Sequence, residues 1–254
     1  MSNRLINKVA VVTGAASGIG EATVRRFVAE GARVIMTDLN VQDGERIAAE
    51  LGSNVLFMRH DVTAAADWQA LAELVRERFQ RLDILVNNAG ILIAGSIEET
   101  TLEQWHTLLR VNADSVFLGC QTAVTLMRES GETGSIINMS SIAALAARDD
   151  YLAYGASKGA VAALTRSVAV HCRRRKYRIR CNSVHPDGVL TAMTRGSYPK
   201  GIDPARLTID HDPMNRACLP EDVAEAVLFL ATDESRAVNG IELRVDSGQF
   251  VMSI

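Results

Sequence analysis

The strongest constraint on the fold of this chain is the regular alternation of two kinds of segment. Short runs of β-branched and aliphatic residues alternate with longer segments of helical period along the whole chain. Because the short runs are apolar at consecutive positions, they are typical of strands that are covered on both faces in a parallel sheet. The pattern predicts an α/β fold, with a doubly wound parallel sheet of about seven strands and helices on both faces.

The expected elements can be assigned to residue ranges. Strands are expected at Lys8–Thr13, Arg33–Thr37, Asn54–Arg59, Leu82–Asn87, Ser135–Met139, Ile179–Val184 and Ile241–Val245. The clearest helical stretches are Gly18–Glu30, Ala64–Gln80, Leu102–Arg128, Tyr151–His171 and Pro220–Ala231. No linker, charge block or internal repeat divides these elements, so residues 1–254 are expected to form a single domain.

One irregular segment interrupts this pattern at residues 191–219. It mixes prolines with charged residues and shows no clear period. A long loop in a compact domain is commonly a lid over a binding site, and we expect a substrate lid here. A surface loop with no role in binding is the alternative.

The composition narrows the classes of function. The 254 residues are 48% hydrophobic and carry a formal charge of −3, which excludes a disordered chain and leaves no broad basic surface for nucleic acid. Met1–Lys8 lacks the apolar stretch of a signal peptide, and no window approaches the roughly 20 apolar residues of a membrane span. We therefore expect a cytoplasmic protein with neither a nucleic acid nor a membrane as its partner.

Neither a disulfide framework nor a metal site is expected. The four cysteines, Cys120, Cys172, Cys181 and Cys218, are too widely spaced for a CxxC motif, so free thiols are predicted. The five histidines are too scattered to show metal-ligand spacing. The basic run Arg173–Lys176, with Arg178 and Arg180, follows an expected helix. We interpret it as a solvated loop that suits a helix C-terminus, in preference to a nucleic-acid patch.

A glycine-rich turn joins the first expected strand to the first expected helix. Its sequence is Thr13-Gly14-Ala15-Ala16-Ser17-Gly18-Ile19-Gly20. Glycines here permit positive φ angles and let the backbone approach a pyrophosphate, which then lies at the positive end of the helix. The position of the turn favours a dinucleotide site in a Rossmann-like domain over an ordinary turn. The candidate cofactor-binding residues are Gly14, Ser17, Gly18, Ile19 and Gly20.

An acidic residue at the end of the second strand favours NAD as the cofactor. Asp38 follows Gly18 by 20 residues, where a carboxylate can accept hydrogen bonds from ribose hydroxyls and would repel the 2′-phosphate of NADP. No arginine stands at the neighbouring positions Ala15, Ala16 or Leu39. A cap on the following helix is the alternative role for Asp38. Leu39 is a further candidate for binding the cofactor. Asp61 and Val62 are candidates for contact with adenine, with a helix N-cap as the alternative role for Asp61.

A tyrosine and a lysine four residues apart are the clearest catalytic signal. Tyr154 and Lys158 stand within Tyr-Gly-Ala-Ser-Lys in an expected helix, so they lie on the same face, one turn apart. A nearby cation lowers a phenol pKa that is about 10 when unperturbed, which suits an acid or base near neutrality. Only four of the 27 basic residues are lysines, and a compact ammonium suits this place better than a planar guanidinium.

In the order of its motifs the chain resembles the short-chain dehydrogenase/reductase family over essentially its whole length. The motifs are the glycine turn, Asn87-Asn88-Ala89-Gly90, Asn112, Ser140-Ser141, the Tyr154 and Lys158 pair, and His185-Pro186-Asp187-Gly188-Val189-Leu190-Thr191. In that family the catalytic serine is the second of the pair, thirteen residues before the tyrosine, which selects Ser141. The resemblance implies a catalytic set of Asn112, Ser141, Tyr154 and Lys158.

The resemblance also implies what each of these residues does. Tyr154 would donate a proton to the substrate carbonyl oxygen, or remove it from the alcohol, while Ser141 hydrogen-bonds the same oxygen. Lys158 would lower the tyrosine pKa and bind the ribose hydroxyls of the nicotinamide half. Asn112 would hold a water that links Lys158 to solvent. Taken singly, Ser141 could be a turn or cap residue and Asn112 a surface residue.

Further cofactor contacts follow from the same resemblance. Asn88, Ala89 and Gly90 would form a wall of the adenosine and ribose pocket, with a plain turn as the alternative. The nicotinamide carboxamide would be held by the segment containing Pro186, Gly188, Val189 and Thr191. Most members have Pro-Gly where this chain has Pro186-Asp187-Gly188, so the turn under the nicotinamide is changed. This segment, with Pro199-Lys200-Gly201 and His211-Asp212-Pro213, is most similar to bacterial 3β/17β-hydroxysteroid dehydrogenases.

Apolar residues beside the motifs indicate the class of substrate. They are Ile91, Leu92, Ile93, Ala143, Leu145 and Ala146. At the carboxyl ends of the strands they would suit a small hydrophobic secondary alcohol or ketone, such as a hydroxysteroid or a cyclic ketone. Packing in the core is the alternative. The resemblance also implies a homotetramer, and the apolar helix face of Val161, Leu164 and Val168 suits either an interface or the core.

Together these observations predict an NAD-dependent oxidoreductase that transfers hydride between nicotinamide and a hydrophobic alcohol or ketone. A β-ketoacyl-type reductase is the second enzyme candidate, but such enzymes usually use NADPH, which Asp38 disfavours. A non-catalytic, dinucleotide-sensing protein is the candidate from another class. The intact set of Asn112, Ser141, Tyr154 and Lys158 argues against it.

Overall fold

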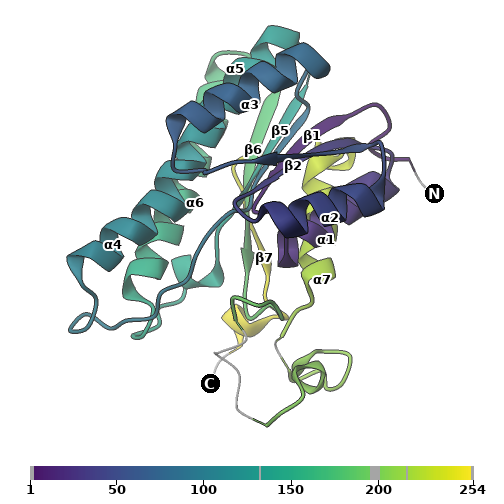
Figure 1. Cartoon of the computed structure of the whole chain (residues 1–254). Helices are drawn as coiled ribbons and strands as arrows, with labels where there is room; N and C mark the ends of the chain where they lie inside the picture. The colour runs from purple at the N-terminus through teal and green to yellow at the C-terminus, as the bar shows by residue number, and fades with distance from the viewer. Residues whose placement is uncertain (1–2, 132, 195–200, 216, 253–254) are drawn as a thin grey trace.

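One parallel sheet forms the centre of the molecule, and helices cover both of its faces (Figure 1). The computed structural model describes residues 3–131, 133–194, 201–215 and 217–252. Its strands are β1 (Val9–Thr13), β2 (Arg33–Asp38), β3 (Val55–Arg59), β4 (Ile84–Asn87), β5 (Gly134–Met139), β6 (Ile179–Pro186) and β7 (Glu242–Val245). They pair in parallel in the order β3-β2-β1-β4-β5-β6-β7, which confirms the predicted doubly wound sheet.

The helices form two layers. They are α1 (Gly18–Ala29), α2 (Val41–Leu51), α3 (Ala65–Arg78), α4 (Leu102–Leu109), α5 (Ser115–Ser130), α6 (Leu152–Arg174) and α7 (Pro220–Ala231). Helices α1, α2 and α7 pack on one face of the sheet, and α3, α5 and α6 pack on the other (Figure 1). Short 3₁₀ turns of the described residues include Ile142–Ala144, Pro204–Leu207, Asp233–Ser235 and Gln249–Val251.

The two cores explain why the strands are apolar at consecutive positions. In β1, Ala10 and Val12 pack beneath α1, α2 and α7, whereas Val11 packs beneath α3, α5 and α6. In β4, Ile84 faces the first core and Leu85 the second. Successive side chains of a strand point to opposite faces, so a strand covered on both sides needs an apolar residue at every position.

Two helical segments add detail to the prediction. Helix α2 was not among the clearest helical stretches, although a helix after Asp38 was allowed for, and along it Gly44 and Ile47 are the buried residues. Its glycine has a packing reason, since a Cβ at Gly44 would lie 2.1 Å from the Phe57 ring. The helical stretch predicted over Leu102–Arg128 is confirmed, with a π-helical turn, Arg110–Asp114, inside it between α4 and α5. Such turns inside helices often occur at functional sites.

The irregular segment after Thr191 is only partly described. Residues 195–200 and 216 lie outside the described residues, as does the Pro199-Lys200 part of the motif that resembles steroid enzymes. In the described part, the turn Pro204–Leu207 is capped by Asp203, whose carboxylate accepts from the Ala205 amide at 3.1 Å. The role of this segment as a lid stays a prediction.

Several smaller expectations can be compared with the structure. All four cysteines are free and buried. The basic run is exposed from Arg173 to Lys176 at the end of α6, whereas Arg180 is partly buried and donates to the Leu230 and Thr232 carbonyls that end α7. Val161 lies in the core and Leu164 and Val168 pack against it, so this apolar helix face belongs to the core.

The described residues also bear on membranes and metals. Within them, no helix has both the length and the hydrophobicity that crossing a bilayer requires. In the same part of the chain, no three His, Cys, Asp or Glu side chains are grouped so that they could hold a metal ion.

Candidate active site

A pocket of about 370 Å³ lies at the carboxyl ends of the central strands. The predicted cofactor-binding residues that line it are Gly14, Ser17, Gly18, Ile19, Asp38, Leu39, Val62, Asn88, Ala89, Gly90, Tyr154, Lys158, Pro186, Val189 and Thr191. Ser141 lines it as well. The sequence therefore predicted most of the residues that line this pocket. Gly20, Asp61, Asn112 and Gly188 are not part of its lining.

The glycine turn is closely packed against the loop after β4. Gly14 and Gly18 have φ angles of +62° and +54°, which disfavour residues with a Cβ. A Cβ at Gly14 would lie 2.7 Å from Ala89 Cα, and one at Gly20 would lie 2.1 Å from the Gly14 oxygen. The side-chain amide of Asn88 donates to that same Gly14 oxygen at 2.9 Å. The glycines leave backbone atoms without side chains along this side of the pocket, at the N-terminus of α1, which suits a pyrophosphate.

The carboxylate of Asp38 is fixed at the edge of the pocket. Its Oδ2 accepts from the Ala16 amide at 3.0 Å and its Oδ1 accepts from the Asn40 amide at 2.9 Å. The cap of α2 is Asn40, whose side chain accepts from the Asp43 amide. The alternative that Asp38 caps the next helix is therefore wrong. Each of its oxygens keeps a lone pair with which to accept a ribose hydroxyl.

Val62 forms part of the same end of the pocket. Its carbonyl accepts a hydrogen bond of 2.9 Å from the Trp68 indole, which fixes the turn before α3. Asp61 is not the N-cap of α3, because that position is Ala64 and Asp61 bonds to Thr63 at 2.7 and 2.9 Å. It stands beside the pocket without lining it.

His60 lines this end and was not expected to. It is 1% exposed, its Nδ1 lies 3.1 Å from the Thr37 hydroxyl, and its ring meets Trp68 edge to face. Burial lowers the pKa of His60 to about 4, although Asp67 and Asp61 oppose this, so the imidazole is neutral near pH 7. A lone histidine after a strand carries no spacing signal, so no sequence pattern points to His60.

Asn112 lies in the π-helical turn and is fully buried. Its Oδ1 accepts from the Ile91 amide at 2.8 Å, while its Nδ2 donates to the Ile91 carbonyl and the Ser157 hydroxyl, both at 3.0 Å. The alternative of a surface asparagine is wrong. The π turn directs this side chain inward, between the loop after β4 and helix α6.

Gly90 leaves space between Asn112 and the catalytic lysine. A Cβ at Gly90 would lie 3.1 Å from Asn112 Oδ1 and 3.3 Å from Lys158 Nζ. A small polar group in that space could contact both. Lys158 itself donates to the Met139 carbonyl at 2.9 Å and is 4% exposed. Burial lowers its pKa to about 8, so its proton can leave near neutral pH.

The phenol of Tyr154 and the hydroxyl of Ser141 are adjacent. Burial raises the pKa of Tyr154, and the hydrogen bond from Ser141 acts in the opposite direction. Lys158 Nζ is 5.8 Å from the centre of the tyrosine ring. The expectation that Lys158 lowers this pKa is corrected here, because desolvation dominates and the counteracting group is Ser141. Ser141 also accepts from the Ala143 amide at 3.1 Å, so it is both a cap and a neighbour of the phenol.

The apolar residues beside the motifs do not belong to the core. Ile91 lines the pocket, and Leu92, Ile93, Ala143 and Ala146 are half-buried. Leu145 is 36% exposed. Asp187 lines the pocket next to Pro186, and its amide donates to the Val245 carbonyl at 3.1 Å.

The pocket therefore combines two chemical functions. One end presents a carboxylate and bare backbone, which suit a ribose and a pyrophosphate. The other end presents two hydroxyls and a buried ammonium, which can bind and protonate an oxygen. A dinucleotide that spans the pocket would bring its reactive ring to the hydroxyls.

Comparison with known proteins agrees with this geometry. A family model described as enoyl-(acyl carrier protein) reductase matches residues 14–249. A 3-beta-hydroxysteroid dehydrogenase of Comamonas testosteroni is 46% identical, with 100% of both chains covered. An NADP-dependent (R)-specific alcohol dehydrogenase of Lentilactobacillus kefiri is 38% identical over 98% of both chains.

Two further matches extend the comparison. A 3-alpha-(or 20-beta)-hydroxysteroid dehydrogenase of Mycobacterium bovis is 42% identical over 98% of this chain and 91% of its own length. The crystal structure of gox2181 superposes with a TM-score of 0.89 at 34% identity, covering 99% of this chain and 98% of that one. Sequence motifs, sheet order and pocket lead to the same conclusion: the chain belongs to the short-chain dehydrogenase/reductase family of oxidoreductases.

Proposed function

We propose that this protein is an NAD-dependent dehydrogenase that interconverts a hydrophobic secondary alcohol, such as a hydroxysteroid or a cyclic alcohol, and its ketone. The observation that carries the proposal is one pocket with Tyr154, Ser141 and Lys158 at one end and Asp38 at the other. The acid/base group and the ribose-binding group are thus placed for one dinucleotide and one substrate.

The residues that would hold the cofactor lie along the pocket from Asp38 to Thr191. Asp38 would accept from the adenosine ribose, the backbone of the glycine turn would face the pyrophosphate, and Lys158 would bind the second ribose. The side chain of Thr191 lies against the turn, since a Cβ at Gly18 would be 3.2 Å from its methyl group. When bound, the nicotinamide would supply or accept the hydride.

The chain's own residues would handle the proton. Because burial raises the pKa of Tyr154, the neutral phenol is favoured, and this form donates to a carbonyl oxygen. The Ser141 hydroxyl would hydrogen-bond the same oxygen and stabilise the charge that develops on it. The space beside Gly90, between Lys158 Nζ and Asn112 Oδ1, is placed for a water that returns the proton from solvent.

The substrate class rests on the apolar surroundings and on the relatives. Ile91, Met139 and Met193 line the pocket, and Leu145 is exposed at the end of the short turn that follows Ser141. Among similar proteins, one is named a 3-beta-hydroxysteroid dehydrogenase and another, 37% identical, a trans-4-hydroxycyclohexanecarboxylate dehydrogenase. A ring-shaped alcohol is common to both names.

The proposal can be tested with a panel of alcohols and ketones followed by NADH absorbance at saturating cofactor. We expect turnover with hydroxysteroids or cyclohexanols and little with sugars or small hydroxy acids, since the surroundings are apolar. A preference for β-ketoacyl thioesters with NADPH would favour the acyl-type reductase. Binding of NAD without turnover on any substrate would favour the non-catalytic sensor.

The cofactor preference makes a separate prediction. We expect wild type to prefer NAD over NADP by roughly 100-fold or more in kcat/KM, because a carboxylate about 4 Å from a phosphate is repelled by several kcal/mol at the protein surface. Asp38→Asn should lower kcat/KM with NAD about tenfold. It should also lower the ratio of kcat/KM with NAD to that with NADP about tenfold. Asp43→Asn is the matched control, since this carboxylate lies in the first turn of α2, accepts from the Asn40 side chain and does not line the pocket. A wild type that uses NADP better than NAD would contradict the role of Asp38.

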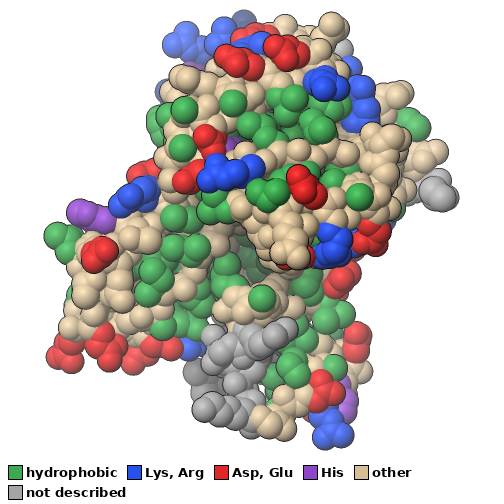
Figure 2. All heavy atoms as spheres, in the orientation of Figure 1, with side chains coloured by type: hydrophobic (Ala, Val, Ile, Leu, Met, Phe, Trp, Pro, Cys, Tyr) green, Lys and Arg blue, Asp and Glu red, His purple; other side chains and the backbone are tan. Residues whose placement is uncertain are grey.

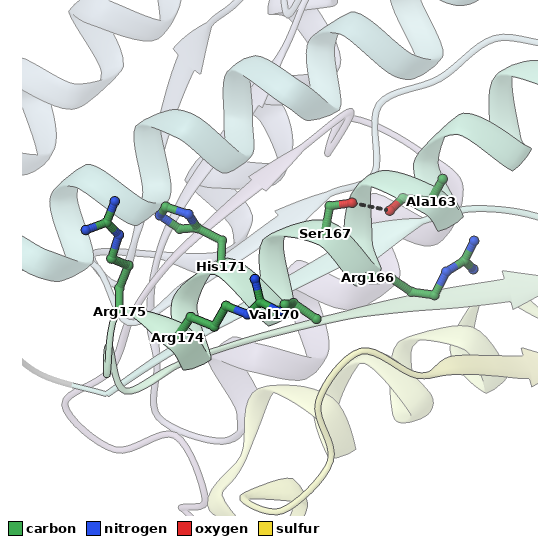
Figure 3. Close-up of a pocket in the computed structure, with 7 residues that line it drawn as sticks. All are labelled: Ala163, Arg166, Ser167, Val170, His171, Arg174 and Arg175. Carbon is green, nitrogen blue, oxygen red and sulfur yellow. Dashed lines mark hydrogen bonds between the residues drawn. The ribbon is translucent and has the colours of Figure 1, made fainter.

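We also propose a homotetramer that uses the outer faces of α5 and α6. Small exposed residues follow one line along α6, namely Ala156, Ala160, Ala163 and Ser167, so another helix can approach closely. On α5, Phe117 is 49% exposed, and Figure 2 shows hydrophobic side chains exposed around α4 and α6. An open pocket of about 900 Å³ adjoins this line on α6, lined by Ala163, Arg166, Ser167, Val170, His171, Arg174 and Arg175 (Figure 3).

Light scattering during gel filtration tests this assembly. We expect the mass of four chains at micromolar concentration for wild type, and a smaller species for Ala160→Arg, because a long charged side chain would hold the facing helices apart. Arg78→Ala, on α3 and outside this face, should leave the mass unchanged. A monomeric wild type would contradict the proposal.

A further inference from the structure

A buried histidine beneath the catalytic end of the pocket contacts the backbone of Ser141. His185 lies near the end of β6 and is 0% exposed. Its Nδ1 is 3.0 Å from the Ser141 carbonyl oxygen, and its Nε2 is 2.9 Å from the Ser183 hydroxyl, which lies farther, at 3.3 Å, from the Ile241 carbonyl. Since Ser183 and His185 are two residues apart on one strand, their side chains lie on the same face of the sheet.

These two contacts determine the tautomer of the imidazole. A carbonyl oxygen only accepts, so Nδ1 must carry the proton and donate to Ser141. Burial lowers the pKa of His185, and the positive charges of Lys158 and Arg166 act in the same direction, while the bond to Ser141 and the charge of Glu242 oppose them. In the neutral ring Nε2 has no proton and accepts from Ser183.

Ser141 is joined to β6 by few contacts. The Ser140 amide donates to the Val184 carbonyl at 2.8 Å, and His185 donates to the Ser141 carbonyl. Besides its side-chain bond to Tyr154, Ser141 accepts from the amides of Ala143 and Ala144 at 3.1 and 3.0 Å, in the short turn that follows it. That turn is half-buried and continues directly from Ser141. Within the described contacts, the imidazole is thus the side chain that fixes the Ser141 backbone relative to the sheet.

We propose that His185 is a positioning residue, which holds Ser141 so that the serine hydroxyl meets both the Tyr154 phenol and the substrate oxygen. The inference rests on the proposed function, in which Ser141 and Tyr154 share that oxygen. A displacement of about 1 Å at a group that contacts the reacting atom can cost up to about 100-fold in rate. The binding of NAD should be unaffected, since His185 is not part of the pocket lining.

Two conservative variants separate positioning from packing. His185→Asn places an amide at the distance of Nδ1 from the backbone, so it can still donate to Ser141. His185→Gln places its amide at the distance of Nε2, so it can contact Ser183 but not Ser141. With the substrate identified above, we expect kcat to fall about tenfold or more in His185→Gln and less than about threefold in His185→Asn, with an unchanged Kd for NAD in both.

Two further readouts do not depend on the size of the rate change. Because the Ser141 hydrogen bond favours the phenolate, loosening it in His185→Gln should raise the apparent pKa of Tyr154 in the kcat profile, whereas His185→Asn should leave that pKa in place. Nitrogen NMR of wild type should show a neutral imidazole protonated at Nδ1, since Nε2 accepts from Ser183.

Each outcome decides between positioning and packing. Equal losses of kcat in both variants, together with unchanged pH profiles, would overturn the inference, because they would mean that the ring only fills space. An NMR signal for protonation at Nε2 alone would overturn it irrespective of activity. A wild type without turnover on any substrate contradicts the proposed function instead, and the NMR result then still tests the contact with Ser141.

Discussion

Replacing Tyr154 with phenylalanine should lower turnover by a factor of about 10³ or more, because the variant loses the one group placed to give a proton to the substrate oxygen. Neighbouring groups cannot replace it. Lys158 donates to the Met139 carbonyl, and Ser141 is not acidic enough to transfer a proton near pH 7. The measurement is kcat at saturating NADH and ketone, in pre-steady-state conditions if the rate is very low.

The control for this variant is a tyrosine outside the site. Tyr177 lies just beyond the C-terminal end of α6, with Arg128 stacked 5.1 Å from its ring centre, so Tyr177→Phe should keep wild-type turnover. Tyr154→Phe should also keep the Kd for NAD within about threefold and melt cooperatively, since its ring still packs. Turnover in Tyr154→Phe within tenfold of wild type would refute the assigned acid.

The Gly20→Ala variant should lose cofactor binding by about 100-fold and unfold more easily by about 1–3 kcal/mol. The added Cβ would lie 2.1 Å from the Gly14 oxygen, 2.9 Å from Ala15 Cα and 2.7 Å from the Asn88 amide nitrogen. Two of these three atoms are backbone, so the whole turn must move to relieve the contact. Isothermal titration with NAD and urea unfolding measure the two effects.

A second glycine-to-alanine change shows that the effect is local. Gly159 lies in α6, next to the catalytic lysine, and a Cβ there meets nothing within 4 Å. Gly159→Ala should therefore bind NAD as wild type does and gain up to about 1 kcal/mol in stability, because alanine favours helices. Wild-type affinity for NAD in Gly20→Ala would show that the cofactor does not approach this turn.

Features encoded within a short stretch could be predicted from the sequence. The central strands are largely apolar at consecutive positions because the sheet has two cores, although β6 also buries Asn182, Ser183 and His185. The glycine turn and the pair Tyr154 and Lys158 could be recognised from the spacing of their residues. The bounds of helix α2 could not be predicted in this way, since it buries little and includes the glycine that makes room for Phe57.

Other features depend on contacts between distant segments. Burial sets the pKa values of Tyr154 and Lys158, so a spacing rule that considers only the pair gives the wrong direction for the phenol. Asn112 acts through the Ile91 backbone, and the π turn that directs it inward has no sequence pattern of its own. His60 contacts Thr37 and His185 contacts Ser141, and the two residues of each pair are far apart in the sequence.

The bond from Asn88 to the glycine turn has a consequence for folding. The two partners, Gly14 and Asn88, stand 74 positions apart along the chain, yet they directly follow the neighbouring strands β1 and β4. Closing so long a loop is slow, and its entropic cost is offset only when β1 pairs with β4 in the centre of the sheet. A chain that has folded only its first three strands therefore has no complete cradle for phosphate. Cofactor binding and the joining of the two halves of the sheet are coupled, so the cofactor should protect the domain as one cooperative unit.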